Sequence, residues 1–230
     1  MDLVSELWYA MAITGKTVVV ILAGLSIYSY AVMVDRGLAL RWTRQRSAVF
    51  ADEIEAGGLM QGEVEVLQER AGDAEQQGHC SLATVVSAGL GEYQMLKDEA
   101  QVGAVVMEGV DEALGRSLDG VVANMRVRLS GMATIVGVAP FLGLFGTVTG
   151  LISAFRGIAT AGGGGIAEVS GGISEALVTT VIGLFVAMPA LWAYNFFMNR
   201  IDVLSLGLEN NAARVVSHVV RRALKANQSL

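Results

Sequence analysis

Two long uncharged stretches, separated by a short glycine-rich segment, constrain this chain more than any other feature. No Asp, Glu, Lys or Arg occurs from Gly131 to Phe155, and none occurs from Ala176 to Asn199. Each stretch exceeds the roughly 20 residues that a helix needs to cross about 30 Å of hydrocarbon. A soluble domain would need a core wide enough to surround both stretches, and the rest of the chain cannot supply one. We therefore predict a hairpin of membrane helices at 131–158 and 172–198, joined by an external turn at 159–171.

A third apolar run, 17–34, is just long enough to span a membrane. The rival interpretation is a cleaved signal peptide, but the first residues are acidic, and Asp35 and Arg36 follow the run where a small-residue cleavage site would be expected. Hydrophobic residues make up 53% of the chain and the mean hydropathy is +0.53, which is typical of a membrane protein with a sizeable polar part. The sequence therefore predicts an all-α integral membrane protein with three transmembrane helices.

The basic residues predict the direction in which the spans run. One side of the membrane carries only Lys16 and Arg156. The other side carries all the remaining flanking basic residues: Arg36, Arg41, Arg44, Arg46, Arg116, Arg126, Arg128, Arg200, Arg214, Arg221, Arg222 and Lys225. Because cytoplasmic flanks are enriched in Arg and Lys, the N-terminus is expected outside and the C-terminus in the cytoplasm. The segment 1–16 is then an outer amphipathic segment lying in the interface, or a frayed terminus.

The two cytoplasmic regions, 35–130 and the C-terminal helix 199–230, are predicted to be helical. Apolar residues recur at steps of three and four along one stretch: Val102, Val105, Val106, Val110, Leu114, Leu118, Val121, Val122, Met125 and Leu129. Because no proline interrupts this stripe, it predicts one continuous helix from Val102 into the second span. Shorter helices are predicted at 41–56, 63–71 and 83–96. We expect long helices that extend from the membrane into a cytoplasmic bundle.

The sequence contains no combination of residues that is typical of an enzyme. Phosphate-binding GxxxxGK[ST] and nucleophile GxSxG motifs are absent. The single cysteine, Cys80, has one histidine beside it and the other, His218, far along the chain, so no metal site is expected. The glycine run at 161–165 is interpreted as an external turn, and the net charge of −6 gives no indication of nucleic-acid binding. No catalytic activity, cofactor or metal is predicted.

Several hydroxyl groups and one carboxylate interrupt the apolar hairpin: Thr147, Thr149, Ser153, Ser174, Glu175, Thr179 and Thr180. Hydroxyls at membrane depth form hydrogen bonds within their own helix, form hydrogen bonds between helices or line a water-filled path. An ionisable group at this depth is a candidate functional residue, although Glu175 also fits a solvated residue at a helix start. Small residues and prolines in the same helices predict close packing and kinks: Gly146, Gly150, Gly183, Pro140 and Pro189.

At these residues the chain resembles a known family. GLFGTVTGLISAF (143–155) and GISEALVTTVIGLFVAMPALWAYN (172–195) resemble the MotA/TolQ/ExbB proton-channel family, and within it the three-span ExbB/TolQ branch. The resemblance implies a homopentamer in the bacterial inner membrane, with a central pore formed by the second and third spans and a periplasmic N-terminus. It also implies two kinds of partner: a single-span ExbD/TolR-type subunit with a membrane aspartate, and a TonB- or TolA-like energy-transducing protein.

The resemblance also assigns expected roles to residues in the hairpin. Thr147 and Thr180 match the family's pore threonines and Glu175 matches its pore carboxylate, while Thr179 is the other candidate for the pore-facing hydroxyl. A proton needs a group that accepts and releases it, and threonine cannot do this near neutral pH, but hydroxyls can bond a carboxyl group in either protonation state. Because no span contains an aspartate, Glu175 or a partner's carboxylate would carry the proton.

The expected function is that of a proton-channel subunit in a motor that uses the proton-motive force to energise TonB-type import or Tol-type envelope processes. Three alternatives remain at this point: a membrane scaffold without ion flux, a solute transporter, and a gliding- or flagellar-type stator subunit. A transporter is disfavoured by three spans without an inverted repeat, and a flagellar stator subunit would be expected to have four spans. Proton and sodium coupling are both compatible with these residues.

Overall fold

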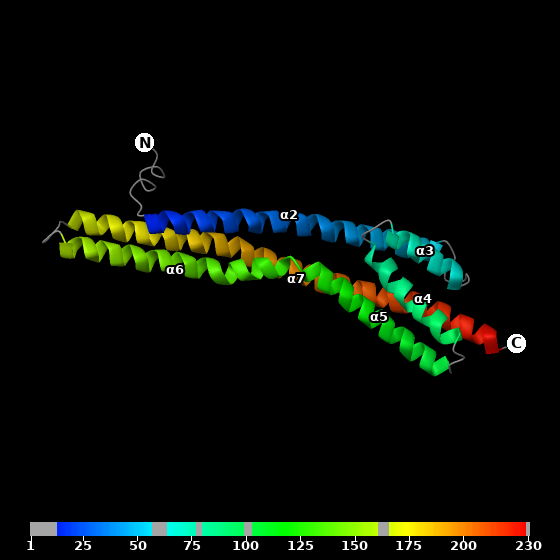
Figure 1. Cartoon of the computed structure of the whole chain (residues 1–230). Coiled ribbons are helices and arrows are strands. Elements are labelled where there is room, and N and C mark those ends of the chain that lie inside the picture. Colours follow the sequence, from blue (N-terminus) through cyan, green and yellow to red (C-terminus); the bar gives the residue numbers. More distant parts are fainter. Residues whose placement is uncertain (1–12, 57–63, 77–79, 99–102, 161–165, 229–230) are drawn as a thin grey trace. The chain divides into compact units, whose positions relative to one another are not determined.

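The computed structural model describes residues 13–56, 64–76, 80–98, 103–160 and 166–228. Nearly all of them are helical, in the order α2 (Ile13–Ala56), α3 (Val64–Gln76), α4 (Ser81–Asp98), α5 (Gly103–Arg126), α6 (Leu129–Thr160) and α7 (Ile166–Gln228) (Figure 1). The prediction of an all-helical chain is therefore confirmed for the part that the structure describes. Most of the predicted outer segment 1–16 and the whole glycine run 161–165 lie outside the described residues.

The described chain forms two compact units. Of the described residues, unit 1 contains those up to Asp35 and those between Arg128 and Phe197, and unit 2 contains those between Arg36 and Val127 and those from Met198 onward. Helices α2 and α7 contribute residues to both units, whereas α6 belongs to unit 1 and α3, α4 and α5 belong to unit 2. The apolar runs 17–34 and 131–155 therefore fall in unit 1, as does the third run up to Phe197.

Among the described residues, three helices are long and apolar enough to cross a membrane, and the qualifying stretches are Ile13–Ala56, Leu129–Gly157 and Gly171–Lys225. They contain the runs predicted as spans. Their outward faces carry large apolar side chains, among them Phe141 at 72% exposure and Trp192 at 70%. A soluble monomer rarely leaves a long row of such side chains in water, so these faces fit contact with lipid or with other chains.

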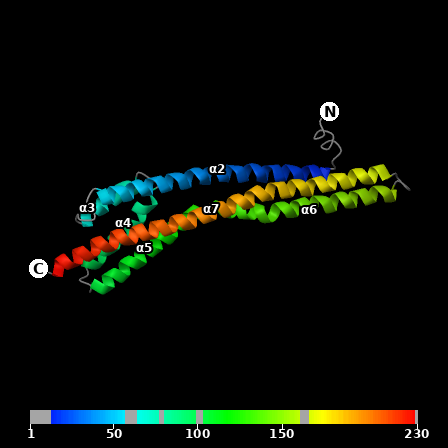
Figure 2. The same ribbon diagram turned by 180° about the vertical axis from the view of Figure 1, so that it is seen from behind.

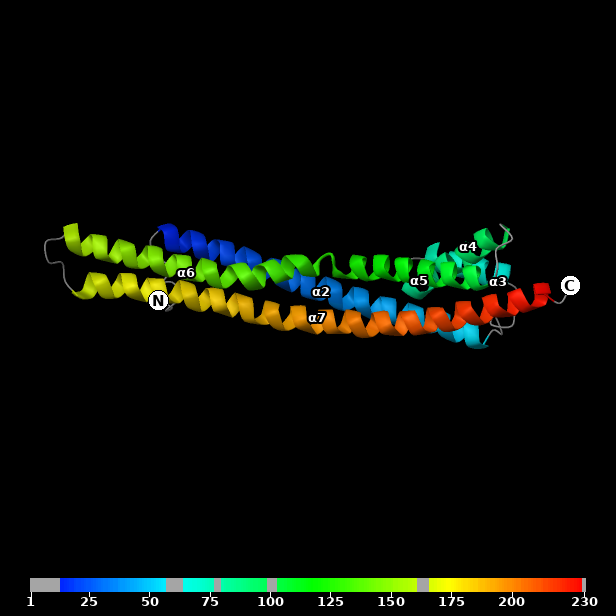
Figure 3. The ribbon, with the colours of Figure 1, turned by 90° about the horizontal axis from the view of Figure 1, so that it is seen from below.

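Helix α2 packs on α6 in unit 1 through an aromatic side chain on a glycine. The Tyr28 hydroxyl would lie 2.6 Å from a Cβ added at Gly131, so a larger residue there would displace this ring. On the other side, α6 runs antiparallel to α7, and the two helices lie side by side from both viewpoints (Figures 1 and 3). Unit 1 is thus a three-helix assembly in which α6 contacts both neighbours.

In unit 2, α4 and α5 pack on each other and on α7 (Figure 2). Gly89 of α4 lies beneath Leu114 of α5 and Val216 of α7, whose side chains would be 2.7 and 3.3 Å from an added Cβ. Part of the apolar stripe predicted along α5 is buried there, namely Val106, Val110, Leu114 and Met125, whereas Val105 is exposed. The periodicity thus identified the buried face of α5.

The helix boundaries differ from the predictions at three places. The predicted helices 17–34 and 41–56 are parts of one helix, α2. Helix α3 does not end before Gly72 but continues through it to Gln76. Helix α7 begins at Ile166, within the range predicted as a turn. In each case the helix is longer than predicted, because polar residues cost a helix less than about 1 kcal/mol each and a glycine costs about 1 kcal/mol, which does not by itself end a helix.

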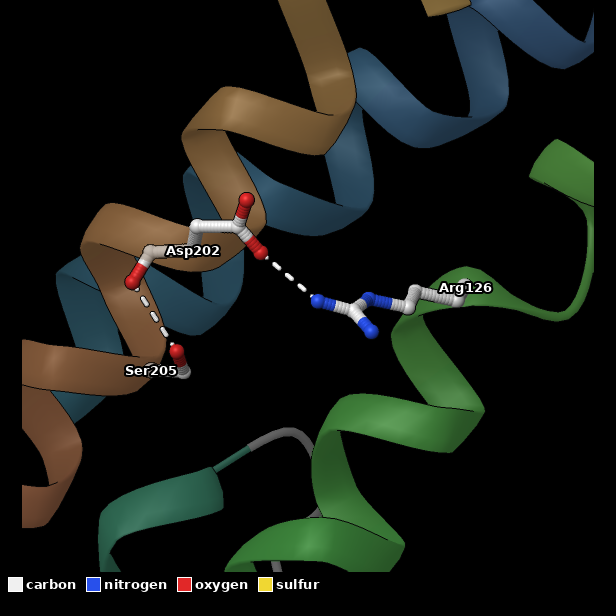
Figure 4. Close-up of polar contacts among 3 residues, drawn as sticks. All are labelled: Arg126, Asp202 and Ser205. Carbon is white, nitrogen blue, oxygen red and sulfur yellow. Dashed lines mark hydrogen bonds and ion pairs between the residues drawn. The ribbon is translucent and has the colours of Figure 1, made fainter.

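The prediction of one continuous helix from Val102 into the second span is wrong. Helix α5 ends at Arg126 and α6 begins at Leu129, with a turn at Val127 and Arg128. Arg126 pairs with Asp202 of α7 at 2.7 Å (Figure 4), and Arg128 pairs with Asp35 of α2 at 2.6 Å.

The end of α5 is also capped by a side chain from α2. The Arg36 guanidinium donates a hydrogen bond to the Met125 carbonyl at 3.3 Å, which satisfies one of the carbonyls that a helix C-terminus leaves unpaired. The positive charge of Arg126 in the last turn is also favourable there. The break is therefore stabilised by partners that are distant in the sequence.

Candidate functional site

The contact between α6 and α7 is built from small residues whose backbones nearly touch. A Cβ added at Gly143 would lie 2.9 Å from the Thr179 carbonyl oxygen, and one added at Gly183 would lie 2.7 Å from the Ala139 carbonyl oxygen. One added at Gly150 would meet the Ala176 side chain at 3.0 Å. Steps of three or four residues along α6 are matched by equal steps back along α7, so these contacts define the register of an antiparallel helix pair.

Thr179 is buried completely at this contact. Its Oγ1 would lie 2.5 Å from a Cβ added at Gly146, so the threonine side chain occupies the space that this glycine leaves open. The hydroxyl donates to the Ala176 carbonyl of its own helix at 2.7 Å and lies 3.3 Å from the Gly143 carbonyl of α6. In a single chain, Thr179 thus holds the two helices together.

Three threonine hydroxyls converge on the carbonyl oxygen of Gly143. Thr147 Oγ1 lies 3.0 Å from this oxygen, Thr180 Oγ1 lies 3.1 Å from it and Thr179 Oγ1 is the most distant. The Thr147 and Thr180 hydroxyls lie 2.5 Å from each other, and either one can be the donor. Both of these side chains are half-buried, in contrast to Thr179. The structure therefore brings together Thr147, Thr179 and Thr180.

The hydrogens of this cluster can be placed in two ways. Each hydroxyl has one hydrogen to donate and two lone pairs to accept with. Thr179 has its shortest bond to Ala176, so the Gly143 carbonyl is left to Thr147 and Thr180. One of these donates to the carbonyl and the other donates to its partner. Because both hydroxyls are within reach of the carbonyl, the donor order can reverse without movement of either helix.

The other predicted polar residues lie away from this cluster. The Thr149 hydroxyl bonds back to the carbonyls of Phe145 and Gly146 on its own helix, at 2.9 and 3.1 Å. Ser153 and Ser174 are exposed. Glu175 belongs to α7, but its side chain lies outside the described part of the structure.

The predicted prolines lie inside helices that do not stop at them. Pro140 is within α6 and Pro189 is within α7. Proline removes one backbone hydrogen bond to the residue four positions earlier, and in membrane helices neighbouring helices compensate for that loss. The helical segments on both sides of each proline therefore belong to one element.

The sequence interpretation missed the Gly143 carbonyl as the acceptor that the threonines share. A signal for it was present, because Thr147 follows Gly143 by four residues, which is the spacing at which a threonine hydroxyl bonds back to a helix carbonyl. The approach of Thr180 from the other helix depends on the register of α6 and α7, which is set by side-chain packing along the whole contact.

The charged groups of the described chain lie outside this cluster. In unit 2, burial raises the pKa of the Cys80 thiol above its ordinary value, although hydrogen bonds from the Ala83 and Leu82 backbone oppose the shift. Among the described residues, no group of three or more His, Cys, Asp or Glu side chains is arranged to hold a metal ion. The chemistry of the α6–α7 site is thus that of hydroxyls and one backbone carbonyl.

Comparison with known proteins gives consistent matches over most of the chain. Residues 80–210 match the model of the MotA/TolQ/ExbB proton channel family. The chain is 32% identical to the Tol-Pal system protein TolQ of Pseudomonas aeruginosa, over 84% of this chain and 82% of that protein. It is 29% identical to TolQ of Haemophilus influenzae, over 86% of each chain. It is 30% identical to the biopolymer transport protein ExbB of Pseudomonas putida, over 91% of this chain and 61% of that protein.

Proposed function

Because the chain belongs to the MotA/TolQ/ExbB proton channel family, we propose that it is the channel subunit of an inner-membrane motor driven by the proton-motive force. In this proposal five copies surround a central pore formed by α6 and α7. The N-terminus is periplasmic and the C-terminus is cytoplasmic. The observation that carries the proposal is the pair of half-buried hydroxyls, Thr147 and Thr180, which share one carbonyl at the α6–α7 contact.

One of the partners proposed for this channel supplies the membrane aspartate that the apolar runs of this chain lack. No aspartate occurs in any of its three apolar runs, and threonine does not ionise near neutral pH. A single-span subunit of the ExbD/TolR type would place its membrane aspartate in the pore. A TonB- or TolA-like protein would transmit the resulting movement to the outer membrane. Glu175 is the carboxylate that this chain itself would add near the outer end of the pore.

The hydroxyl pair can serve a carboxyl group in both of its protonation states. A deprotonated carboxylate only accepts hydrogen bonds, so the hydroxyl facing it would donate to it and accept the hydrogen of the other hydroxyl. A protonated carboxyl donates, and the hydroxyl facing it then accepts. The reversible donor order of Thr147 and Thr180 allows both arrangements without a change in the distance between α6 and α7. The carboxyl group would carry the proton, and the threonines would orient it.

The test is proton flux into liposomes that contain this chain with and without its single-span partner. Thr180→Val keeps the shape of the side chain and removes the hydroxyl. We expect flux that requires the partner's membrane aspartate and that falls at least tenfold in Thr180→Val, with the complex still assembled. Thr149→Val is the matched control, because the Thr149 hydroxyl bonds only within its own helix. Equal flux in the two variants would restrict Thr180 to packing, and no partner-dependent flux from an intact complex would favour a scaffold.

A further inference from the structure

Unit 2 carries two exposed faces of opposite charge. One lies on α5, where Glu108, Asp111 and Asp119 are exposed and surround the exposed Gly115 at steps of three and four residues. The other lies near the C-terminal end of α7, where Arg221, Arg222 and Lys225 are exposed within little more than one turn. We call these the acidic face and the basic face.

One end of the acidic face, at Glu108, lies close in height to the basic face along unit 2. Helices α5 and α7 run antiparallel and their register is fixed at both ends. The Arg126–Asp202 ion pair joins them at one end (Figure 4), and Leu224 lies 3.8 Å from a Cβ added at Gly103 at the other. Between these points, at 1.5 Å per residue, Glu108 is level with about residue 219 of α7. It is therefore within about 5 Å, along the helix axis, of both Arg221 and Arg222.

The two faces do not neutralise each other within one chain. The ion pairs of α5 use other groups: Arg116 pairs with Glu92 and Glu112, and Arg126 pairs with Asp202. Across the residues that the structure describes, no ion pair joins the acidic face to the basic face. Glu108 and Asp111 on the acidic face, and Arg221, Arg222 and Lys225 on the basic face, thus lie three or four residues from a like charge, and like charges at such spacing repel each other. An oppositely charged surface from outside the chain would remove this repulsion.

We propose that the acidic face of one copy binds the basic face of the next copy in the oligomer. This inference rests on the proposed function, which requires a closed ring of identical chains. In a ring whose axis runs along α5 and α7, rotation keeps every residue at its own height, so along that axis Glu108 of one copy comes within about 5 Å, and Asp111 within about 9 Å, of Arg221 and Arg222 of its neighbour. Gly115 has no other atom within 4 Å of an added Cβ, so it leaves room for a neighbouring helix to approach closely. Complementary charges at nearby heights also favour one orientation of neighbouring copies.

Disulfide crosslinking tests this contact in the full chain. In a Cys80→Ala background, Glu108→Cys and Arg221→Cys are combined, and the membranes are oxidised. We expect a ladder of dimers and larger covalent oligomers. The matched control combines Asp119→Cys with Arg221→Cys, because Asp119 belongs to the same face but lies about 16 Å further along α5 than Glu108. The control is expected to give little or no ladder.

A charge exchange tests the same contact without an introduced cysteine. Arg221→Glu with Arg222→Glu is expected to lower the fraction of full-size oligomer at least threefold at low salt, and adding Glu108→Arg with Asp111→Arg is expected to restore it. Failure of the exchange to restore the oligomer would overturn the proposal. In the crosslinking experiment, a disulfide within single chains, or one from Arg221→Cys to the single-span partner, would also overturn the proposal.

Native mass measurement separates this inference from the proposed function. An intact oligomer that gives no ladder from Glu108→Cys with Arg221→Cys contradicts the contact and leaves the channel proposal standing. A purely monomeric chain in lipid nanodiscs contradicts both, because the ring itself is then absent. An oligomer with the expected ladder supports the contact.

Discussion

Gly183 is the position where α6 and α7 approach each other most closely through their backbones, and Gly183→Ala should separate them. The added Cβ would lie 2.7 Å from the Ala139 carbonyl oxygen and 3.0 Å from the Gly143 Cα. Ordinary contact begins at 3.4 Å, so the methyl group is about 0.7 Å too close to a backbone atom that cannot rotate away. The helices themselves must therefore move.

The size of the effect follows from two opposing terms. Replacing a helical glycine by alanine normally stabilises a helix by about 1 kcal/mol, because the backbone loses less freedom. Overpacking a tight contact costs about 1–3 kcal/mol. The first term is shared by Gly137→Ala in α6 and Gly24→Ala in α2, where nothing lies within 4 Å of the added Cβ. Gly183→Ala should therefore be less stable than either control by the overpacking term alone, about 1–3 kcal/mol.

Unfolding in mixed micelles of increasing SDS content, followed by circular dichroism, measures this difference. Proton flux gives a second readout, because Gly183 lies one turn from Thr180, and separation of the helices would lengthen the 2.5 Å contact between Thr180 and Thr147. We expect Gly183→Ala to unfold at lower SDS than both controls and to conduct less. If Gly183→Ala unfolded at the same SDS fraction as Gly137→Ala, the α6–α7 contact would not be as close as described and the reasoning would be refuted.

Two further predictions concern groups outside the α6–α7 contact. Since burial raises the pKa of the Cys80 thiol, little thiolate is present at neutral pH, and maleimide labelling should be at least tenfold slower in the native protein than in SDS; equal rates would contradict the burial of this residue. The Arg128–Asp35 ion pair is partly exposed, so a double-mutant cycle with alanine should give a coupling of about 0.5 kcal/mol that falls in high salt. A salt-independent coupling above about 2 kcal/mol would instead indicate a desolvated pair.

The sequence predicted the helical elements well because the signals for them are local. Uncharged runs longer than about 20 residues and a stripe at three- and four-residue steps are properties of short windows. The break between α5 and α6 is different. Nothing in residues 121–130 predicts it, since they contain neither proline nor glycine, and the partners Asp35 and Asp202 that stabilise it lie far away in the chain. Such a break depends on tertiary contacts.

The two adjacent threonines of α7 show the same limit at the site. Thr179 and Thr180 have identical side chains, and the helix turns about 100° between them. The sequence therefore does not show which of the two hydroxyls faces the pore. The register set by Gly143, Gly150 and Gly183 separates their environments, because it buries Thr179 over Gly146 and leaves Thr180 half-buried beside Thr147. The hydroxyl that a carboxyl group can reach from outside the helix pair is thus that of Thr180. Thr179→Val should consequently destabilise the helix pair more than it reduces the flux of the folded fraction, and Thr180→Val should do the reverse.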